Sequence, residues 1–227
     1  MQKAYESSFD EGFYDYHGIG ELTCPNGWTP AWLEGTEQGI LYRPEYDVKD
    51  REKGQPEVRM GRYAANFFTS YATHDACLYR KFRVGAGNGV RASVWCMNVT
   101  HDKRGRPGGH GMRIGIDPTG GIDHTAPTVI YGDYWSSYME GWKERKWKQV
   151  DTEAVAQADE ITVFLHARCD YKAEINASHW DDLELQVGAP DEIEPPEQAA
   201  FKLESMSLEQ LKNLVRQIVQ DELGKSQ

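Results

Sequence analysis

The sequence predicts an all-β fold, an antiparallel β-sandwich, followed by a linker and one amphipathic C-terminal α-helix. Three observations predict it. Short segments alternate apolar and polar residues with the period of two that places one face of a strand in a core. Clusters of Gly, Pro, Asn and Asp separate these segments and are typical of turns. No run of apolar residues at helical spacing occurs before residue 190, so the predicted strands are expected to pack on one another.

The strand segments are read in chain order from this alternation. The clearest are 78–84, 90–97, 112–117, 161–167 and 180–187. Residues 85–89 contain three glycines and predict a hairpin between the first two segments, and residues 118–121 predict a turn. The segments 36–62 and 101–111 show little periodicity, and both are predicted to be long surface excursions.

The composition changes near residue 188, where the predicted β domain of residues 1–188 ends. Residues 189–204 are acidic and Pro-rich and predict an extended linker. In residues 205–227, the spacing of Ser207 and Gln210 matches a helix capping box, and an apolar stripe follows at Leu208, Leu211, Val215 and Ile218. A helix this short is marginal alone in water, so the stripe must be buried. Self-assembly or docking on a partner is the favoured interpretation, and packing on its own β domain is the alternative.

Charge and length limit the function classes. The chain has 227 residues, with 25 Lys and Arg against 36 Asp and Glu, and a net charge of −11. Such an acidic chain repels a phosphate backbone, so nucleic acid is not an expected partner. No apolar run approaches the ~18 residues of a membrane span. The start of the chain lacks the apolar region of a secretory signal, which predicts a protein made in the cytoplasm.

Three short motifs occur in an order that is known from one family. They are Ser8-Phe9-Asp10-Glu11-Gly12, the stretch 141–150 that begins with Gly and Trp, and His179-Trp180-Asp181-Asp182-Leu183-Glu184-Leu185. Over about residues 4–188 the chain resembles the galactose-binding-like jelly-roll carbohydrate-binding modules. The resemblance implies a jelly-roll sandwich whose first and last strands meet, and a noncatalytic role in binding glycans. It does not cover the linker or the C-terminal helix.

The same resemblance implies a structural calcium ion. In the family this ion often ties the first strand to the last, and hard carboxylate and carbonyl oxygens suit Ca²⁺. Here Asp10 would be one ligand, in the place of a Glu that is one methylene longer, and Asp181 or Asp182 would supply the partner carboxylate. The alternative is that these carboxylates are solvated or accept hydrogen bonds from backbone N–H groups.

Aromatic residues gather in one stretch and are the expected ligand contacts. Five of them fall within residues 131–142, and one strand face is not expected to bury them all. Aromatic rings stack on the C–H faces of sugars while nearby polar groups bond hydroxyls. The predicted ligand-binding residues are Tyr134, Trp135, Tyr138 and Trp142, together with Trp32. The alternative is that these rings belong to the core, which is the interpretation favoured for Trp95, Trp147 and Trp180.

The sequence shows no motif that assigns an enzymatic reaction. The hydrolase elbow, the P-loop and His-Glu-x-x-His are absent, and the four cysteines lack zinc-ligand spacing and are expected to be buried thiols. The segment 117–124 contains two Asp and one His near a turn, and His74 and Asp75 are adjacent. For both, a turn or structural role is favoured over metal binding or acid–base chemistry.

Three functions are compatible with these patterns. The favoured one is a noncatalytic glycan-binding protein that assembles as a homo-oligomer, or docks on a partner, through its C-terminal helix. The second is a structural virion protein, such as a phage decoration or tail component, that binds no glycan. It is compatible with the lack of a secretion signal, since a virion is released by lysis. The third, a jelly-roll polysaccharide lyase or hydrolase, has the least support.

Overall fold

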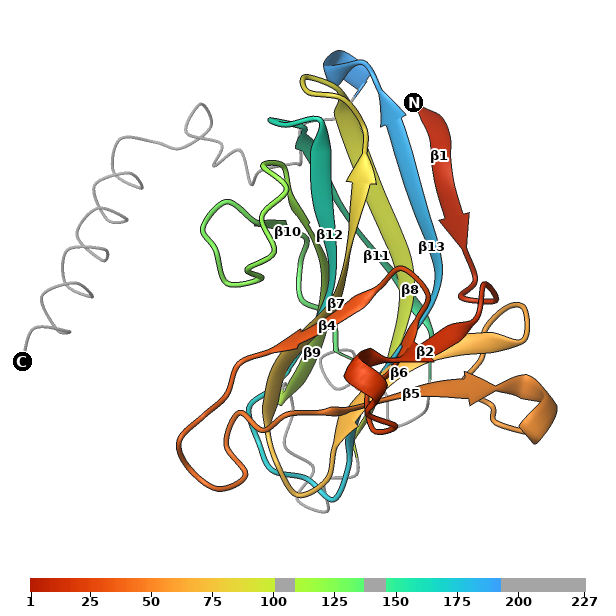
Figure 1. The fold of residues 1–227 in the computed structure, drawn as a ribbon, viewed down its shortest axis with the longest axis vertical. Helices are drawn as coiled ribbons and strands as arrows, with labels where there is room; N and C mark the ends of the chain where they lie inside the picture. The colour runs from red at the N-terminus through yellow and green to blue at the C-terminus, as the bar shows by residue number, and fades with distance from the viewer. Residues whose placement is uncertain (101–108, 137–145, 193–227) are drawn as a thin grey trace, which may run out of the picture. The chain divides into compact units, whose positions relative to one another are not determined.

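The computed structural model describes residues 1–100, 109–136 and 146–192. Residues 1–193 form one compact unit, in which two antiparallel sheets lie face to face (Figure 1). The six-stranded sheet has the order β11-β8-β13-β6-β5, with β1 also paired to β13. The five-stranded sheet has the order β10-β9-β12-β7-β4, and β2 and β3 form a small separate ribbon. The predicted antiparallel β-sandwich is confirmed.

The strands of the two sheets and of the ribbon have the following bounds. In the six-stranded sheet they are β1 (Gln2–Ser7), β5 (Glu45–Asp50), β6 (Tyr63–Thr69), β8 (Gly89–Thr100), β11 (Lys148–Val155) and β13 (Asn176–Gly188). In the five-stranded sheet they are β4 (Thr29–Trp32), β7 (His74–Arg83), β9 (His110–Asp117), β10 (Ile130–Tyr131) and β12 (Glu160–Cys169). The ribbon consists of β2 (Phe13–Asp15) and β3 (Thr23–Pro25), and short 3-10 turns occupy Tyr16–Gly18, Arg51–Lys53 and Pro190–Glu192.

The first and last strands of the described sandwich are paired, as the resemblance implies. β1 runs beside β13 (Figure 1), and Ser7 lies opposite Leu183 in the register. Phe9, which follows β1, and Leu183 belong to the same buried core cluster. Residues from opposite ends of this unit therefore share one core.

Alternation along the long strands creates the core between the two sheets. On β12 the residues Ile161, Val163 and Leu165 are fully buried and belong to the core cluster, while the intervening residues lie on the outer face of the five-stranded sheet. The six-stranded sheet contributes Trp180 from β13 and Val94 from β8. All four cysteines are buried and unpaired, as expected from their spacing.

Several predictions about loops need correction. The turn at 85–89 joins β7 to β8, which belong to different sheets, so it is a crossover and not a hairpin. The predicted excursion 36–62 contains β5, an edge strand whose Tyr46 is buried against both sheets and donates its hydroxyl to the Ala31 and Cys77 carbonyls. The mixed charge of the segment 36–62 obscures the sequence pattern of β5, because only one face of an edge strand needs to be apolar.

Three tryptophans predicted to be core residues differ in their burial. Trp180 is fully buried, as predicted. Trp95 and Trp147 are only half-buried, and the Arg59 guanidinium covers the Trp95 ring at 3.8 Å from the ring centroid. Trp95 lies on the outer face of β8, one residue out of phase with the core residues Val94 and Cys96.

Some predictions lie outside the described residues. The C-terminal helix with Leu208, Leu211, Val215 and Ile218 is one of them, and so is most of the linker 189–204, of which residues 190–192 form a 3-10 turn. Within the described residues, no helix is long and apolar enough to cross a membrane.

Candidate functional site

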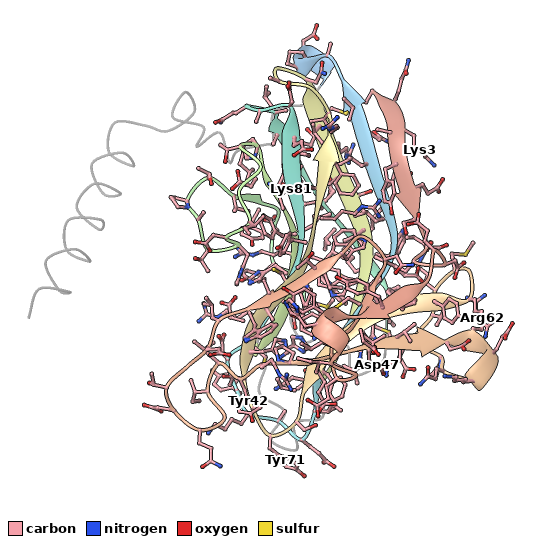
Figure 2. The ribbon with its side chains drawn as sticks, in the orientation of Figure 1. Lys3, Tyr42, Asp47, Arg62, Tyr71 and Lys81 are labelled. Carbon is pink, nitrogen blue, oxygen red and sulfur yellow. The ribbon has the colours of Figure 1, made fainter. Side chains whose placement is uncertain are left out.

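The outer face of the five-stranded sheet carries a cluster of charged and titratable side chains. In the register of β12 with its neighbours, His166 lies opposite Arg113 of β9 and Cys77 of β7. Arg168 lies opposite Asp75 of β7. Because these residues alternate with core residues, they share the face that points away from the core. Lys81, further along β7, lies on the same face (Figure 2).

Two glycines on β9 make room for aromatic rings on this face. A Cβ atom at Gly115 would lie 2.5 Å from Cε1 of Tyr131, and one at Gly111 would lie 2.9 Å from Cδ1 of Tyr134. The chain that follows β9 returns through β10, where Tyr131 pairs with Gly115. Tyr131 and Tyr134 therefore lie over β9 on either side of Arg113.

The two rings enclose the Arg113 guanidinium. Its Cζ atom lies 3.6 Å from the centroid of the Tyr131 ring and 4.0 Å from that of the Tyr134 ring. Both distances are well inside the range in which a cation is attracted to the face of an aromatic ring. The guanidinium is therefore held in one orientation by contacts on two sides.

Arg113 begins a chain of hydrogen bonds that ends at His124. Its Nε–H donates to Nδ1 of His166 at 3.0 Å. Since arginine has no acceptor, Nδ1 of His166 must carry the lone pair, and the proton of the neutral ring is on Nε2. That N–H lies 2.8 Å from Oδ1 of Asp75, and Nε2 of His124 lies 3.1 Å from the same oxygen.

The network sets the charge state of its members. Burial opposes ionisation of Asp75, but the hydrogen bonds from His124 and His166 outweigh it and hold the pKa of Asp75 well below its usual value. Burial lowers the pKa of His166 despite the attraction of Asp75, and the neighbouring Arg113 lowers it further. The cluster therefore contains an ionised carboxylate, a neutral His166 and a permanently charged Arg113.

Asp75, His124 and His166 also form a group of potential metal ligands. One ligand atom from each lies within 4.8 Å of the others, and among the residues that the structure describes no other group of three does so. The hydrogen bonds do not fit a metal at this point. A histidine ligand usually donates its second ring N–H to an acceptor, whereas His166 accepts from Arg113. Its Nε2 is then protonated and has no lone pair for an ion.

A cavity of about 320 Å³ opens beside this network. Its lining combines charged groups, hydrogen-bonding groups and aromatic rings. The lining residues are Asp75, Arg113, His124, Thr125, Ala126, Tyr131, Tyr134, His166 and Arg168. Two other cavities lie elsewhere, one on the outer face of the six-stranded sheet around Arg91 and Asp151 and one near the 85–89 crossover, and neither is lined by an aromatic residue.

The predicted ligand-binding residues lie in different parts of the structure. Tyr134 lines the cavity and exposes 37% of its surface. Trp135 exposes 6% and belongs to the core, so it has no free ring face for a sugar and that prediction is wrong. Trp32 lies apart from the cavity, where it packs against the core and donates its Nε1–H to Glu34 at 3.2 Å. Tyr138 and Trp142 lie outside the described residues.

The sequence patterns include parts of this cluster but do not show that they meet. For His74-Asp75 and the segment 117–124 the sequence favours a turn or structural role. Asp117 has that role, since it accepts hydrogen bonds from the Thr119 N–H at 2.8 Å and the Thr128 hydroxyl at 2.9 Å. His124, from the same segment, is the member that reaches Asp75. His166 and Arg113 gave no sequence signal beyond their place in alternating strands.

The carboxylates predicted as calcium ligands contact the segment 59–63, two of them through its backbone and one through a side chain. Asp10 accepts from the N–H groups of residues 62 and 63, both at 2.9 Å. Asp181 accepts from those of residues 59 and 60 at 2.8 and 3.1 Å, and Asp182 forms an ion pair with the Arg59 side chain. The three carboxylates do not form a close ligand group of the kind found at Asp75. Calcium binding by these residues stays a prediction from the sequence.

Comparisons with known proteins concern the fold. No protein-family model matches the sequence, and no curated protein matches it. The K1 cleaved adhesin domain of Lys-gingipain from Porphyromonas gingivalis W83 superposes with a TM-score of 0.50 at 11% identity, over 82% of this chain and 98% of that one.

Two carbohydrate-binding modules are also similar in structure. TmCBM61, solved with β-1,4-galactotriose, has a TM-score of 0.46 at 15% identity, over 72% of this chain and 90% of that one. The CBM22-1 xylan-binding domain of Paenibacillus barcinonensis Xyn10C has a TM-score of 0.47 at 14% identity, over 83% and 96%. The described part of the chain therefore shares the overall fold of that adhesin domain, and its own sheets form an antiparallel β-sandwich.

Proposed function

We propose that the protein is a noncatalytic carbohydrate-binding β-sandwich whose ligand occupies the cavity on the outer face of the five-stranded sheet. The observation that carries the proposal is the lining of this cavity, where Tyr131 and Tyr134 lie next to Arg113 and the Asp75–histidine network. Sugar binding needs apolar surface for the C–H faces and a few fixed polar groups for the hydroxyls.

The polar groups of the cavity are held in place before a ligand arrives. Arg113 is fixed by two rings and one hydrogen bond, and Asp75 is fixed by two histidines. Groups that are already oriented lose little conformational entropy on binding. A hydroxyl-rich ligand would therefore meet donors and acceptors whose positions are set by the strands β7, β9 and β12.

The presence of a single carboxylate in the described lining favours binding over hydrolysis. Glycoside hydrolases use a pair of Asp or Glu residues that flank the scissile bond. Among the described residues that line this cavity, Asp75 is the one acidic side chain, and its Oδ1 accepts from two histidines. A residue engaged in this way positions its neighbours and is poorly suited to act as nucleophile or general acid.

The experiment is a glycan-array and calorimetric binding study with a matched pair of tyrosine variants. Tyr134→Ala removes a ring from the cavity, and Tyr42→Ala removes a more exposed ring, 60% exposed, from the connection between β4 and β5 (Figure 2). We expect Tyr134→Ala to weaken binding at least about tenfold, as loss of a good aromatic contact does, and Tyr42→Ala to bind like the parent. Absence of binding to every glycan would contradict the proposal and favour a structural virion protein.

We propose further that the C-terminal segment 205–227 assembles the protein. This rests on the apolar stripe in the sequence alone, since the segment lies outside the described residues. Leu211→Asp would place a charge in the stripe, and Asn213→Asp would place the same charge outside it. Light scattering of the full chain should show a smaller mass for Leu211→Asp only. A monomeric parent chain would exclude self-assembly and leave docking on another protein.

A further inference from the structure

We propose that the ligand of this cavity carries a carboxylate, as an acidic saccharide does, and that Arg113 is the residue that recognises it. The inference rests on the proposed function and goes further, since it names the chemical class of the ligand and the group that selects it.

The first step is the state of the Arg113 charge. Its Nε–H donates to the neutral His166, and its two faces lie against tyrosine rings. Within the described part of the chain, no carboxylate forms an ion pair with Arg113, although acidic residues outnumber basic ones by 36 to 25. Arg168, the other arginine of the cavity, pairs with Asp170 at 2.9 Å.

The second step concerns Asp75, the acidic member of the hydrogen-bond network that contains Arg113. Its Oδ1 is shared by the Nε2 atoms of His124 and His166, so the His166 ring lies between the carboxylate and Arg113. Nδ1 of the ring accepts from Arg113 and its Nε2 donates to Asp75, so His166 separates the carboxylate from the guanidinium and the two form no direct hydrogen bond. Arg113 thus presents a cation to the cavity, and Asp75 satisfies the two histidines.

The third step is the match between this cation and a ligand. The two terminal amino groups of a guanidinium form a planar fork that binds both oxygens of a carboxylate. In Arg113 these groups have no hydrogen-bond partner among the described residues, and the side chain lines the cavity. The fork is already oriented by the rings, which leaves most of the interaction energy for the ligand. A neutral sugar would offer it hydroxyls only, which bind a cation less strongly.

The size of the cavity limits the ligand further. Its volume of about 320 Å³ is near the lower end of the range for small-molecule sites, which is roughly 300–1000 Å³. It fits a short saccharide or the end of a chain. Tyr134 would cover an apolar face of the sugar ring while the carboxylate meets Arg113.

The experiment compares acidic saccharides with their uncharged counterparts by isothermal titration calorimetry. The probes are disaccharides and trisaccharides of galacturonic and glucuronic acid, their methyl esters, and the neutral galactose and glucose oligomers of the same length. A sulfated disaccharide and inorganic phosphate distinguish a carboxylate site from a general anion site. We expect at least one uronate probe to bind about tenfold or more tightly than its ester and its neutral analogue.

Variants of the full chain assign the effect to Arg113. Arg113→Gln should abolish the preference for the acid over the ester, and Arg113→Lys, which keeps the charge but not the fork, should retain only part of it. Arg83→Gln, at a side chain that is 89% exposed outside this cavity, is the charge-matched control. A thermal melt of each variant shows that it is folded.

The outcomes separate the inference from the function on which it rests. If the parent binds neutral sugars as well as acids and Tyr134→Ala abolishes both, the glycan site stands and the carboxylate inference is wrong. Equal binding of the sulfated disaccharide, inorganic phosphate and the uronate would also overturn it, because the site would then recognise anions in general. If no saccharide binds, both proposals fail. Unsaturated products formed from a uronate probe would instead reveal a lyase and contradict the noncatalytic assignment.

Discussion

The Arg113 side chain depends on two positions that have no side chain at all. Gly111 and Gly115 leave the space that the Tyr134 and Tyr131 rings fill, so the glycines determine how close the rings come to β9. Their role could not be read from the sequence, since glycine in a strand usually indicates a bulge or a weak point. Here the close approach is made by aromatic side chains from the chain that follows the strand.

Gly115→Ala tests this arrangement at the scale of one residue. The new Cβ would lie 2.5 Å from Cε1 and 2.6 Å from Cδ1 of Tyr131, so the ring must move and its contact with Arg113 must loosen. Overpacking of this kind costs about 1–3 kcal/mol of the free energy of unfolding. Gly20→Ala is the control, because a Cβ there would have no neighbour within 4 Å. Equal urea denaturation midpoints for both variants would contradict the close packing.

The strands that could be predicted are those with a clean period of two. The segments 90–97, 112–117, 161–167 and 180–187 lie within observed strands, and 78–84 does so except for Val84, which follows the last residue of β7. β6 and β11 are not among these segments. β6 is buried on both faces and contains Asn66, so it lacks a clean alternation, and β11 carries charged side chains on its outer face. Pairings between distant strands leave no local signal, so the sequence could not show that β7, β9 and β12 bring Asp75, Arg113 and His166 together.

At the scale of elements, Asp181 connects β13 to the segment that precedes β6. Its Oδ2 accepts from the N–H groups of residues 59 and 60, and its Oδ1 accepts from the N–H of Asp182 at 2.9 Å, where β13 has a bulge. Asp181→Asn cannot satisfy all three donors, because its amide nitrogen would face an N–H. We expect a loss of about 1–3 kcal/mol in the free energy of unfolding. Asp151→Asn, at an exposed ion pair, should change it by less than about 1 kcal/mol.

The outcome that would contradict this role of Asp181 is also specific. If Asp181→Asn and Asp151→Asn unfold at the same denaturant concentration, the carboxylate does not hold the segment 59–60 to β13. Faster hydrogen exchange of the two amides in Asp181→Asn only would support it.

At the scale of the whole molecule, one end of the core is polar. His74 and His110 lie between the sheets with their rings 5.5 Å apart. His110 bonds the Thr100 hydroxyl at 2.9 Å and the Ser178 hydroxyl at 2.8 Å through its two nitrogens. Burial lowers the pKa of His110 to about 3, and burial also lowers the pKa values of His74 and His166. All three are neutral in the folded protein at neutral pH.

These buried histidines predict how stability depends on pH. A histidine in the unfolded chain titrates near ~6.5, so as the pH falls below that value the unfolded chain binds protons that the folded protein cannot. The free energy of unfolding should therefore fall as the pH is lowered from about 6.5 towards 3. Burial raises the pKa of Asp181 to about 7. Its protonation in the folded protein therefore increases the free energy of unfolding as the pH falls from 7 to about 4. This is the contribution of one group, and the three histidines act in the other direction.

Urea denaturation at a series of pH values measures this dependence. His110→Asn should reduce the slope of the free energy of unfolding against pH, because one of the three neutral groups is removed, whatever it does to the stability at pH 7. His17→Asn, at an exposed histidine, should leave the slope unchanged. Identical slopes in the parent and His110→Asn would show that His110 titrates normally in the folded protein.

The central claim is that the cavity on the outer face of the five-stranded sheet is where a ligand binds. The most direct measurement is a titration of the isotope-labelled protein with a short uronate oligosaccharide, followed by NMR of the backbone amides and the arginine Nε–H groups. The account predicts saturable shifts of the Arg113 Nε–H and of amides in β7, β9 and β12. Shifts confined to the six-stranded sheet, or no shifts with any saccharide that binds, would contradict it.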